Sequence, residues 1–414
     1  MAIANPFAGQ RILVGVSGSI AAVKVPQLVS ALVQRGAEVR CLLTPSAARL
    51  VSAVALASLS RHPCLQDADE WDPRQARPLH IELAEWAQLV LLAPLTASTL
   101  ARLVHGLADN LLASTLMASG APRLYAAAMN TQMWQAAAVQ RNWRQLQAEP
   151  RGLALAPASD GLLACDSRGA GRMLEPALLL LAAESLLLHG AGRDLQGRRI
   201  LVTAGPTREA LDPARFLSNP STGLMGVLLA QAARLRGAEV RLLHGPLALD
   251  PALLEGLQCT SFITAAELEQ ALGQQQAWAE AVLMAAAVAD QRLRQPLAHK
   301  SAKQDLQQLL LQPDSWEPVP DLLQQLVQRR PAGQLLLGFA AHTGDLLAQA
   351  EPKLLRKGCD LLFVNPIDQP EAGFGSASNQ GWLLQADGPA QCLAPASKLA
   401  IAHQLLDAVA RSLA

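Results

Sequence analysis

Three residues in the first half of the chain could carry acid–base chemistry. His80 lies just before a predicted helix, Asn130 follows a predicted strand over 124–128, and Cys165 lies in a glycine-rich loop over 161–173. An imidazole can act as a base, an amide can bind a carboxylate, and a thiol on a loop can deliver a proton. Taken singly, each residue is more typical of a helix cap, a turn or a buried side chain.

The second half contains residues suited to phosphate chemistry. A long polar loop over 203–226 contains Ser221-Thr222-Gly223, which opens a predicted helix, and the N-terminus of a helix favours an anion. Asp290 ends a later strand, and Lys300 follows in a polar loop. A carboxylate near lysines suits a divalent cation on a triphosphate. For any one of these residues, a helix cap or a solvated surface position is the simpler interpretation.

Both halves repeat one order of elements. The run 35–40, Arg-Gly-Ala-Glu-Val-Arg, recurs at 236–241, and each copy follows an amphipathic run and precedes an apolar one. Gly36 and Gly237 are predicted to follow a helix C-terminus with positive φ. Alternation of strands and helices implies parallel sheets with right-handed crossovers. The sequence therefore predicts two Rossmann-like three-layer α/β domains with mainly parallel sheets, residues 1–190 and 191–414. Two unrelated domains that share this common arrangement explain the repeat as well as a duplication does.

Composition excludes several classes of protein. The chain has 414 residues, 34 basic and 34 acidic, and zero net charge argues against nucleic-acid binding. It is 51% apolar but only 3% aromatic, which predicts cores of Leu, Val and Ala and excludes disorder. The most apolar run, 176–188, contains Glu184 and is too short to span a membrane, and no signal peptide is expected. Six scattered cysteines form no metal or disulfide pattern, so the reducing cytoplasm is expected.

The first glycine turn, residues 15–20, follows the first predicted strand. It does not match G-x-G-x-x-G, and no acidic residue ends the second strand over 41–44, which argues against a nicotinamide cofactor. Small hydroxyl residues at a helix N-terminus suit a monophosphate instead. Packing of the turn explains the same residues equally well.

In order, GVSGSIAAVK, HIEL, APLTAST, AAMNTQMW and ACDSRGAGRM resemble the flavin-dependent cysteine decarboxylases, over about residues 8–190. The nearest resemblance within them is to phosphopantothenoylcysteine decarboxylase. It implies a flavodoxin-like flavoprotein domain that binds FMN between the subunits of a trimer. It also implies that His80 is the base, that Asn130 holds the substrate carboxylate, and that Cys165 completes the reduction. The FMN-binding residues that it implies are Gly15, Ser17, Gly18, Ser19, Thr44, Pro94, Thr96, Ser98 and Met129, with Ser17 and Ser19 near the phosphate.

The chemistry of this family explains those residue types. Direct loss of CO₂ from a cysteinyl amide would leave an unstabilised carbanion. Oxidation of the thiol to a thioaldehyde by FMN places the carboxylate β to an electron-poor C=S group, so CO₂ can leave to give an enethiol. Return of the electrons then requires a proton at carbon, a suitable role for Cys165. Val23, Ala127 and Asp166 depart from the Tyr, Pro and Gly of the family pattern.

The ordered segments of the second half resemble phosphopantothenate–cysteine ligase over about residues 191–410. The bacterial type uses CTP and Mg²⁺, forms an acyl-cytidylate with release of pyrophosphate, and lets cysteine displace CMP. The resemblance implies that Asn219 contacts the acyl group, Arg215 orders its loop, and Asp290 serves the metal. The nucleotide-binding residues that it implies are Ser221, Gly223, Ala286, Asp290, Lys300, Phe339, Lys353 and Lys357. Leu224 stands where the family has Lys, and His342 where it has Glu.

Together the two resemblances imply a bifunctional enzyme of coenzyme A biosynthesis. Its small-molecule partners would be 4′-phosphopantothenate, L-cysteine and CTP, without nucleic acid or membrane. Trimeric contacts between first halves and dimeric contacts between second halves would close a homo-oligomer such as a dodecamer. The alternatives are a flavin prenyltransferase-like enzyme, a flavin-binding regulatory subunit, and a protein with only the decarboxylase half active. Retention of His80, Asn130 and Cys165 argues against the regulatory subunit.

Overall fold

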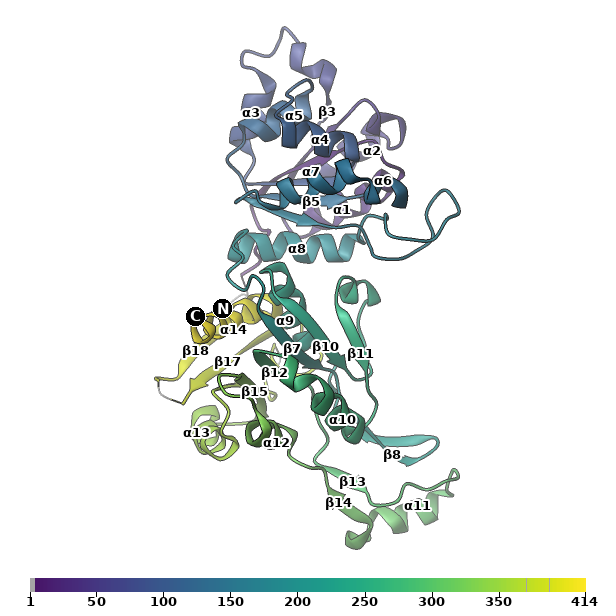
Figure 1. The fold of residues 1–414 in the computed structure, drawn as a ribbon, viewed down its shortest axis with the longest axis vertical. Coiled ribbons are helices and arrows are strands. Elements are labelled where there is room, and N and C mark those ends of the chain that lie inside the picture. The colour runs from purple at the N-terminus through teal and green to yellow at the C-terminus, as the bar shows by residue number, and fades with distance from the viewer. Residues whose placement is uncertain (1–3, 370, 387) are drawn as a thin grey trace. The chain divides into compact units, whose positions relative to one another are not determined.

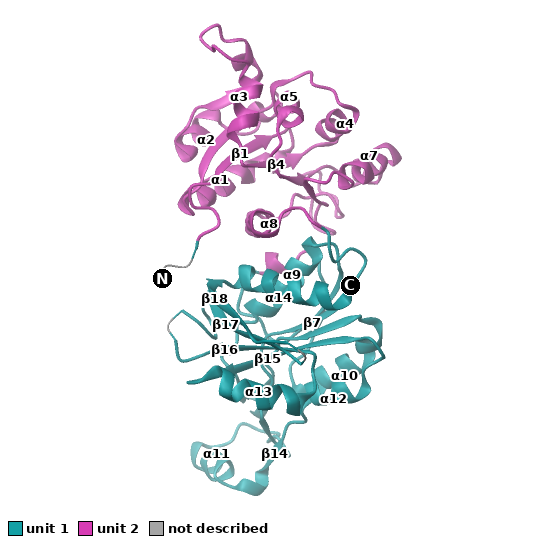
Figure 2. Cartoon of the chain, turned by 90° about the vertical axis from the view of Figure 1, so that its left-hand side faces the viewer, with its two compact units in different colours: residues 1–4, 193–250, 257–414 teal, residues 5–192, 251–256 magenta. Residues whose placement is uncertain are grey.

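The computed structural model describes residues 4–369, 371–386 and 388–414, and the chain forms two compact units (Figure 2). The first unit comprises Asn5–Gly192 together with a short segment, Pro251–Gly256. The second unit comprises Arg193–Asp250 and Leu257–Ala414, with Ala4. The sequence does not indicate that the short segment packs with the first unit.

A sheet of six strands forms the centre of the first unit. The strands are β1 (Arg11–Val16), β2 (Glu38–Leu43), β3 (Cys64–Gln66), β4 (Leu89–Leu95), β5 (Arg123–Ala127) and β6 (Gly152–Leu155). Their order is β3-β2-β1-β4-β5-β6, and every neighbouring pair is parallel. All of β4 is buried, as expected for a parallel strand that is covered on both faces.

Helices cover both faces of this sheet (Figure 1). The α-helices are α1 (Val25–Gln34), α2 (Ala53–Ser60), α3 (Leu79–Trp86), α4 (Ala97–His105), α5 (Leu111–Ala118), α6 (Thr131–Gln135), α7 (Ala137–Gln147) and α8 (Pro176–His189). Four 3-10 helices join them: η1 (Ile20–Lys24), η2 (Ala47–Arg49), η3 (Asp67–Trp71) and η4 (Pro251–Leu254). Leu83, Leu100, Leu112 and Trp143 place α3, α4, α5 and α7 against Val90 on one face. Contacts of α1 with α2 and α8 form the layer on the other face.

The second unit has a sheet of eight strands. They are β7 (Arg199–Ala204), β10 (Glu239–His244), β11 (Gln258–Ser261), β12 (Ala281–Met284), β15 (Leu335–His342), β16 (Leu361–Pro366), β17 (Ser378–Gln385) and β18 (Gln391–Ser397). Their order is β11-β10-β7-β12-β15-β16-β17-β18. The first six are parallel, in the same relative order as in the first unit. β17 pairs antiparallel with β16, and β18 pairs antiparallel with β17. The prediction of two α/β units with mainly parallel sheets is confirmed.

Helices also form two layers in the second unit, with α9 and α14 on one face of the sheet and α10, α12 and α13 on the other (Figure 2). The α-helices are α9 (Leu224–Leu235), α10 (Ala265–Gln275), α11 (Lys303–Leu310), α12 (Leu322–Arg329), α13 (Leu346–Lys357) and α14 (Lys398–Leu413). Two short 3-10 helices are η5 (Gln276–Trp278) and η6 (Pro313–Ser315). As the composition predicts, Leu, Val and Ala dominate the buried residues.

Two hairpins project from the second unit (Figure 1). One is formed by β8 (Arg208–Asp212) and β9 (Arg215–Ser218), within the segment that the sequence predicted to be a polar loop. The other is formed by β13 (Gln291–Leu293) and β14 (Trp316–Pro318), and α11 lies between its strands in sequence. We call the second hairpin, α11 and the connecting loop 294–302 the arm. No helix among the described residues is long and apolar enough to cross a membrane.

The strand order determines where ligands can bind. In each unit the strand order reverses at a central pair, β1 and β4 or β7 and β12. The strands that follow the first member of the pair lie on one side of it, and those that follow the second member lie on the other side. In sheets of this kind a crevice forms at the carboxyl ends of that pair. Gly36 and Gly237 have φ values of 85° and 94°, so their predicted role after α1 and α9 is confirmed.

Candidate active sites

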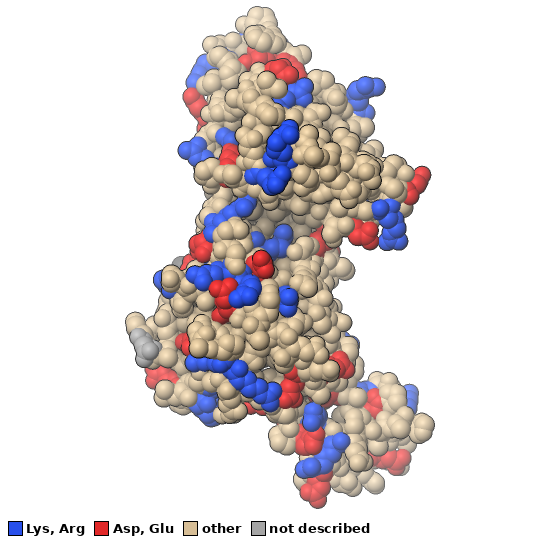
Figure 3. Space-filling model, viewed as in Figure 1, with Lys and Arg blue, Asp and Glu red and all other residues tan. Residues whose placement is uncertain are grey.

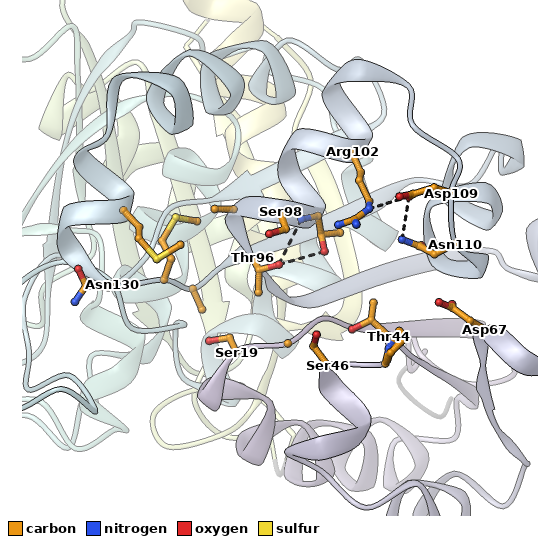
Figure 4. Close-up of a pocket in the computed structure, with 17 residues that line it drawn as sticks. Ser19, Thr44, Ser46, Asp67, Thr96, Ser98, Arg102, Asp109, Asn110 and Asn130 are labelled. Carbon is orange, nitrogen blue, oxygen red and sulfur yellow. Dashed lines mark hydrogen bonds and ion pairs between the residues drawn. The ribbon is translucent and has the colours of Figure 1, made fainter.

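An elongated cavity of about 480 Å³ lies at the carboxyl edge of the first sheet. We call it the hydroxyl cavity, because Thr96 and Ser98 line it opposite Ser19, Thr44 and Ser46 (Figure 4). Asn130 lies at one end of the cavity and the Arg102–Asp109 ion pair at the other. This volume lies within the range of small-molecule sites.

Local geometry explains how these loops come together. Thr96 caps α4 by accepting a hydrogen bond from the backbone N–H of Thr99, and the first turn of α4 lines the cavity. The partial positive charge of that helix end therefore faces the cavity. A Cβ atom on Gly18 would lie 2.3 Å from the Cβ atom of Ser46, so a glycine is required where the loops after β1 and β2 meet. Of the predicted FMN-binding residues, Gly18, Ser19, Thr44, Thr96, Ser98 and Met129 line this cavity.

Three other predicted FMN-binding residues lie outside the cavity lining. Ser17 is 1% exposed, and its hydroxyl donates to the Pro94 carbonyl at 2.7 Å and accepts from the Thr96 N–H at 3.0 Å. Ser17 thus joins the ends of β1 and β4, and its position near a phosphate stays a prediction. Pro94 lies buried within β4. Gly15 faces α5, where a Cβ atom would approach Leu112 to 2.6 Å.

Asn130 and Cys165 meet at a neighbouring cavity of about 340 Å³, which we call the thiol cavity. The Asn130 amide Nδ2 donates to Cys165 Sγ at 3.3 Å, although the two residues lie on different loops. The backbone N–H of Met129 donates to the Gly171 carbonyl at 3.0 Å and ties the cysteine loop to the end of β5. The two cavities share Ser19, Ala128, Met129 and Asn130. Two residues predicted to act together are therefore adjacent.

Hydrogen bonds change the acidity of the thiol. Cys165 is exposed, and its Sγ lies 3.1 Å from Ser167 Oγ. The hydrogen bonds of Ser167, and to a smaller extent that of Asn130, lower the pKa of Cys165 below its ordinary value. Cys165 is therefore a stronger acid than an ordinary cysteine.

Asp166 occupies a backbone conformation that favours glycine. Its φ is 60°, in the left-handed region. Aspartate tolerates this region better than most residues, and a β-branched residue does not.

We expect Asp166→Gly to keep decarboxylation at or above the level of the unmodified protein, and Asp166→Val to reduce it about tenfold, because left-handed strain costs roughly 1–2 kcal/mol. Both changes remove the carboxylate, and only Val is strained at this φ. Initial rates of CO₂ release would measure the effect. Equal rates for the two variants would contradict a role for the backbone of this residue.

His80 lies away from Asn130 and Cys165, and lines neither cavity. It is the second residue of α3 rather than lying before it, and its Nδ1 is 2.6 Å from Glu70 Oε1 of η3. The backbone N–H of His80 donates to the other carboxylate oxygen, Oε2, at 3.0 Å. A carboxylate at Nδ1 favours the tautomer in which Nε2 accepts a proton. The sequence analysis missed Glu70, whose only signal is an acidic run ten residues before the histidine.

The second unit has a cavity of about 550 Å³ at the equivalent sheet edge, which we call the lysine cavity. Lys353, Lys357, Asp290 and Phe339 line it, as does Ala286. Burial and the neighbouring Lys357 lower the pKa of Lys353. Asp321 also lines the cavity and forms an ion pair with Lys357, so Lys353 is the lysine there that a bound anion could pair with directly.

Asn219 also lines the lysine cavity and holds its wall in place. Its Nδ2 donates to the carbonyls of Ala287 at 3.3 Å and Val288 at 3.0 Å, in the loop after β12. His342 places Nε2 3.4 Å from Lys353 Nζ. Burial and the neighbouring Lys353 lower the pKa of His342, which favours the neutral imidazole beside the lysine.

A smaller cavity of about 120 Å³ lies beside the lysine cavity and shares Ala286 and Phe339 with it. Ser221, Gly223 and Leu224 line this small cavity at the start of α9. Gly223 has a φ of 82°, and a Cβ atom there would lie 2.2 Å from Leu247. Glycine is favoured at this position, and the predicted contact of the turn with a nucleotide stays a prediction.

Two predicted ligase residues lie outside both cavities. Lys300 is exposed in the loop of the arm, and Arg215 lies on β9. Arg215 Nη2 donates to the Ser301 carbonyl at 3.1 Å, and its Nη1 lies 3.6 Å from Asp212. Arg215 therefore orders the loop that carries Lys300. The sequence predicted a loop-ordering role for Arg215 and a nucleotide contact for Lys300, and that contact stays a prediction. The sequence did not reveal that the two hairpins project from the sheet.

Two family models match the chain. The model described as "DNA/pantothenate metabolism flavoprotein C-terminal domain" matches residues 195–413, and the one described as "Flavoprotein" matches residues 5–182. The "Coenzyme A biosynthesis bifunctional protein CoaBC" of Bacillus subtilis is 38% identical, over 97% of each chain. Proteins of that name from Mycobacterium bovis and Escherichia coli K12 are 40% and 37% identical, over 98% and 92% of this chain and 97% and 92% of theirs.

Proposed function

The chain belongs to the family of the coenzyme A biosynthesis bifunctional proteins, and on that premise we propose two consecutive reactions for it. The second unit joins cysteine to 4′-phosphopantothenate, using CTP and releasing pyrophosphate. The first unit decarboxylates the product, 4′-phosphopantothenoylcysteine, to 4′-phosphopantetheine. The observation that carries this proposal is the contact of Asn130 with Cys165, because it brings an amide and an acidic thiol to one cavity.

We place FMN in the hydroxyl cavity. Hydroxyl groups such as those of Ser19 and Ser46, with the start of α4, suit its phosphate, and Ala97 and Met129 offer apolar surface to its ring. When bound, FMN would take two electrons from the substrate thiol and return them after CO₂ has left.

The residues at the thiol cavity supply the other steps. The Asn130 amide donates to the substrate carboxylate and orients the bond that breaks. Once CO₂ has left, the Cys165 thiol delivers a proton to carbon as the electrons return. The backbone bond between Met129 and Gly171 keeps the cysteine loop at this position. Decarboxylation therefore depends on two loops that a few hydrogen bonds hold together.

The acidity of Cys165 predicts a shift in pH dependence. Because the hydrogen bonds of Ser167 lower the pKa of Cys165, proton delivery should fail as the pH rises through that lowered value. In Ser167→Ala the pKa of Cys165 should rise, so formation of the saturated product should persist to higher pH. Single-turnover rates of that product over a pH series would measure the shift. An unchanged profile would remove Cys165 as the acid.

His80 would complete the decarboxylase site from a second copy of the chain. His80, with its partner Glu70, lines neither of the cavities at which Asn130 and Cys165 lie. A trimer in which FMN lies between subunits would supply the imidazole of one copy to the cavity of the next. Exposed apolar residues of the first unit, Ile20, Val23 and Val54 among them, are available to such contacts.

For the ligase, we place the nucleotide in the lysine cavity and Mg²⁺ at Asp290. Magnesium is commonly held by one or two carboxylates together with substrate phosphates. The lining of the cavity fits that mode, because Asp290 is a carboxylate at the edge where the triphosphate would lie. Lys353 and Lys357 would neutralise the triphosphate, and Asn219 would orient the reacting carboxylate.

Dimeric contacts between second units would bring Lys300 to the nucleotide. Lys300 lies on the projecting arm, next to the Ser301 carbonyl that Arg215 holds. An arm anchored in this way can extend into the cavity of a second copy. The proposed ligase site, like the decarboxylase site, is then completed by a neighbour.

Recognition of these anionic substrates would be local. The net charge is zero, and blue and red side chains are interspersed on the face in Figure 3. Long-range attraction of phosphates is therefore weak, and helix ends, a metal and single lysines take its place. All six cysteines are free, which suits a reducing compartment such as the cytoplasm.

Separate assays test the two halves of the proposal. With CTP, Mg²⁺, cysteine and phosphopantothenate, the protein should release pyrophosphate. With phosphopantothenoylcysteine alone, it should release CO₂ and show a flavin absorbance spectrum. A colourless protein without CO₂ release would contradict the decarboxylase, and absence of pyrophosphate would contradict the ligase.

A further inference from the structure

A buried lysine lines the small cavity of the second unit. Lys398 is 4% exposed, and its Nζ donates to the Gly373 carbonyl at 3.0 Å. The Gly373 carbonyl is the only hydrogen-bond partner of the Lys398 side chain among the described residues. No carboxylate in that part of the chain pairs with the ammonium group. Burial lowers the pKa of Lys398, because the charged form loses hydration. A buried cation with one carbonyl partner is electrostatically unfavourable unless an anion joins it.

The position of Lys398 in its helix adds to this cost. It is the first residue of α14, a helix of sixteen residues, where the helix dipole repels a cation. The neutral side chain of Ser397 already caps the helix by accepting from the Ala400 N–H at 3.1 Å. Lys398 is thus unfavourable for the fold on two counts, which is typical of a residue retained for binding.

The cavity itself suits a single phosphoryl group. Of the described residues that line it, Lys398 alone is charged, and Asn365 and Asn379 add amide groups. The start of α9, a helix of twelve residues, lies at the same cavity. Its volume of about 120 Å³ is too small for a nucleoside and adequate for a phosphate.

Leu224, an apolar residue, also lines this cavity. We propose that Lys398 and the start of α9 form a subsite for one phosphoryl group of a ligase substrate, at which Lys398 supplies the positive charge. This inference rests on the proposed ligase activity. The phosphoryl group belongs either to CTP or to phosphopantothenate.

The test uses two variants of the full chain that remove the charge. Lys398→Met is apolar, whereas Lys398→Gln can still donate to the Gly373 carbonyl. We expect the KM of one substrate, CTP or phosphopantothenate, to rise about tenfold to a hundredfold in both variants, since charged hydrogen bonds are worth that much. The substrate affected identifies the phosphoryl group. Unchanged KM values for both substrates, or full activity of Lys398→Gln, would overturn the proposal.

Rescue and a binding measurement complete the test. Adding Leu224→Lys to Lys398→Met returns a positive charge to the same cavity and should recover most of the lost affinity, and failure to recover any would contradict the role of that charge. Pyrophosphate and inorganic phosphate, each without nucleotide, should raise the Tm of the second unit's transition in the unmodified protein and not in Lys398→Met. This readout remains valid if no ligation occurs, so loss of the proposed function and loss of the subsite are distinguishable.

Discussion

His80→Asn should abolish decarboxylation and leave ligation unchanged. Removal of a general base costs about 10²–10⁴ in rate, and Asn cannot take up the proton. The Glu70 carboxylate that now contacts Nδ1 would be left without a base to orient. CO₂ release and pyrophosphate release, measured on the same sample, separate the two activities. His105→Asn, on the exposed last turn of α4, is the matched control and should retain both.

Mixing two inactive variants tests whether the site is shared between copies. His80→Asn lacks the base and Cys165→Ser lacks the thiol, but a mixed trimer pairs the intact His80 of one copy with the intact Cys165 of the next. Random mixing in equal amounts should restore about a quarter of the unmodified activity, by symmetry of the closed ring. If His80 acted within its own chain, every site would lack one group and no activity would return.

Asp290→Asn should abolish formation of the acyl-cytidylate and leave the first unit's chemistry intact. The carboxylate is the group we assign to Mg²⁺ on the triphosphate, and Asn removes its charge with little change of shape. Loss of one such electrostatic contact costs about 10²–10³ in rate. Pyrophosphate release at saturating CTP would measure this. CO₂ release from phosphopantothenoylcysteine should be unaffected.

A matched control separates the metal role from general charge. Asp314→Asn changes an exposed carboxylate in η6, away from both ligase cavities, and should keep full pyrophosphate release. Raising the Mg²⁺ concentration should partly restore Asp290→Asn. Full activity of Asp290→Asn at low Mg²⁺ would contradict the assignment of the metal.

Much of the fold was predictable because local signals agree with it. Continuous apolar runs mark the buried parallel strands, and Gly36 and Gly237 end their helices at the predicted places. Short or edge elements were not predictable. β3 has three residues, and the strands of the β8–β9 hairpin are short and mix charged with apolar residues without a regular alternation. The antiparallel pairing of β8 with β9 depends more on the contacts of the hairpin in the folded unit than on a hydrophobic pattern in the sequence.

The sequence could predict candidate site residues of two kinds, namely glycines that a turn requires and residues at the ends of parallel strands. Gly223, Asp290 and Asn130 are such residues, since strand ends of a parallel sheet meet at one edge. Side-chain direction was not predictable, because a serine after a strand can face a cavity or, as Ser17 does, a neighbouring strand. Lys398 was missed because a lysine at the start of a helix is usually solvated, and the sequence does not reveal burial.

The central claim is that one chain carries both steps at two separate sites. The most direct measurement incubates the protein with phosphopantothenate, cysteine, CTP and Mg²⁺ and identifies the products by mass. The account predicts phosphopantetheine, CMP and pyrophosphate, and it predicts that phosphopantothenoylcysteine accumulates instead with His80→Asn. Phosphopantetheine formed without CTP, or neither product formed with every substrate present, would contradict it.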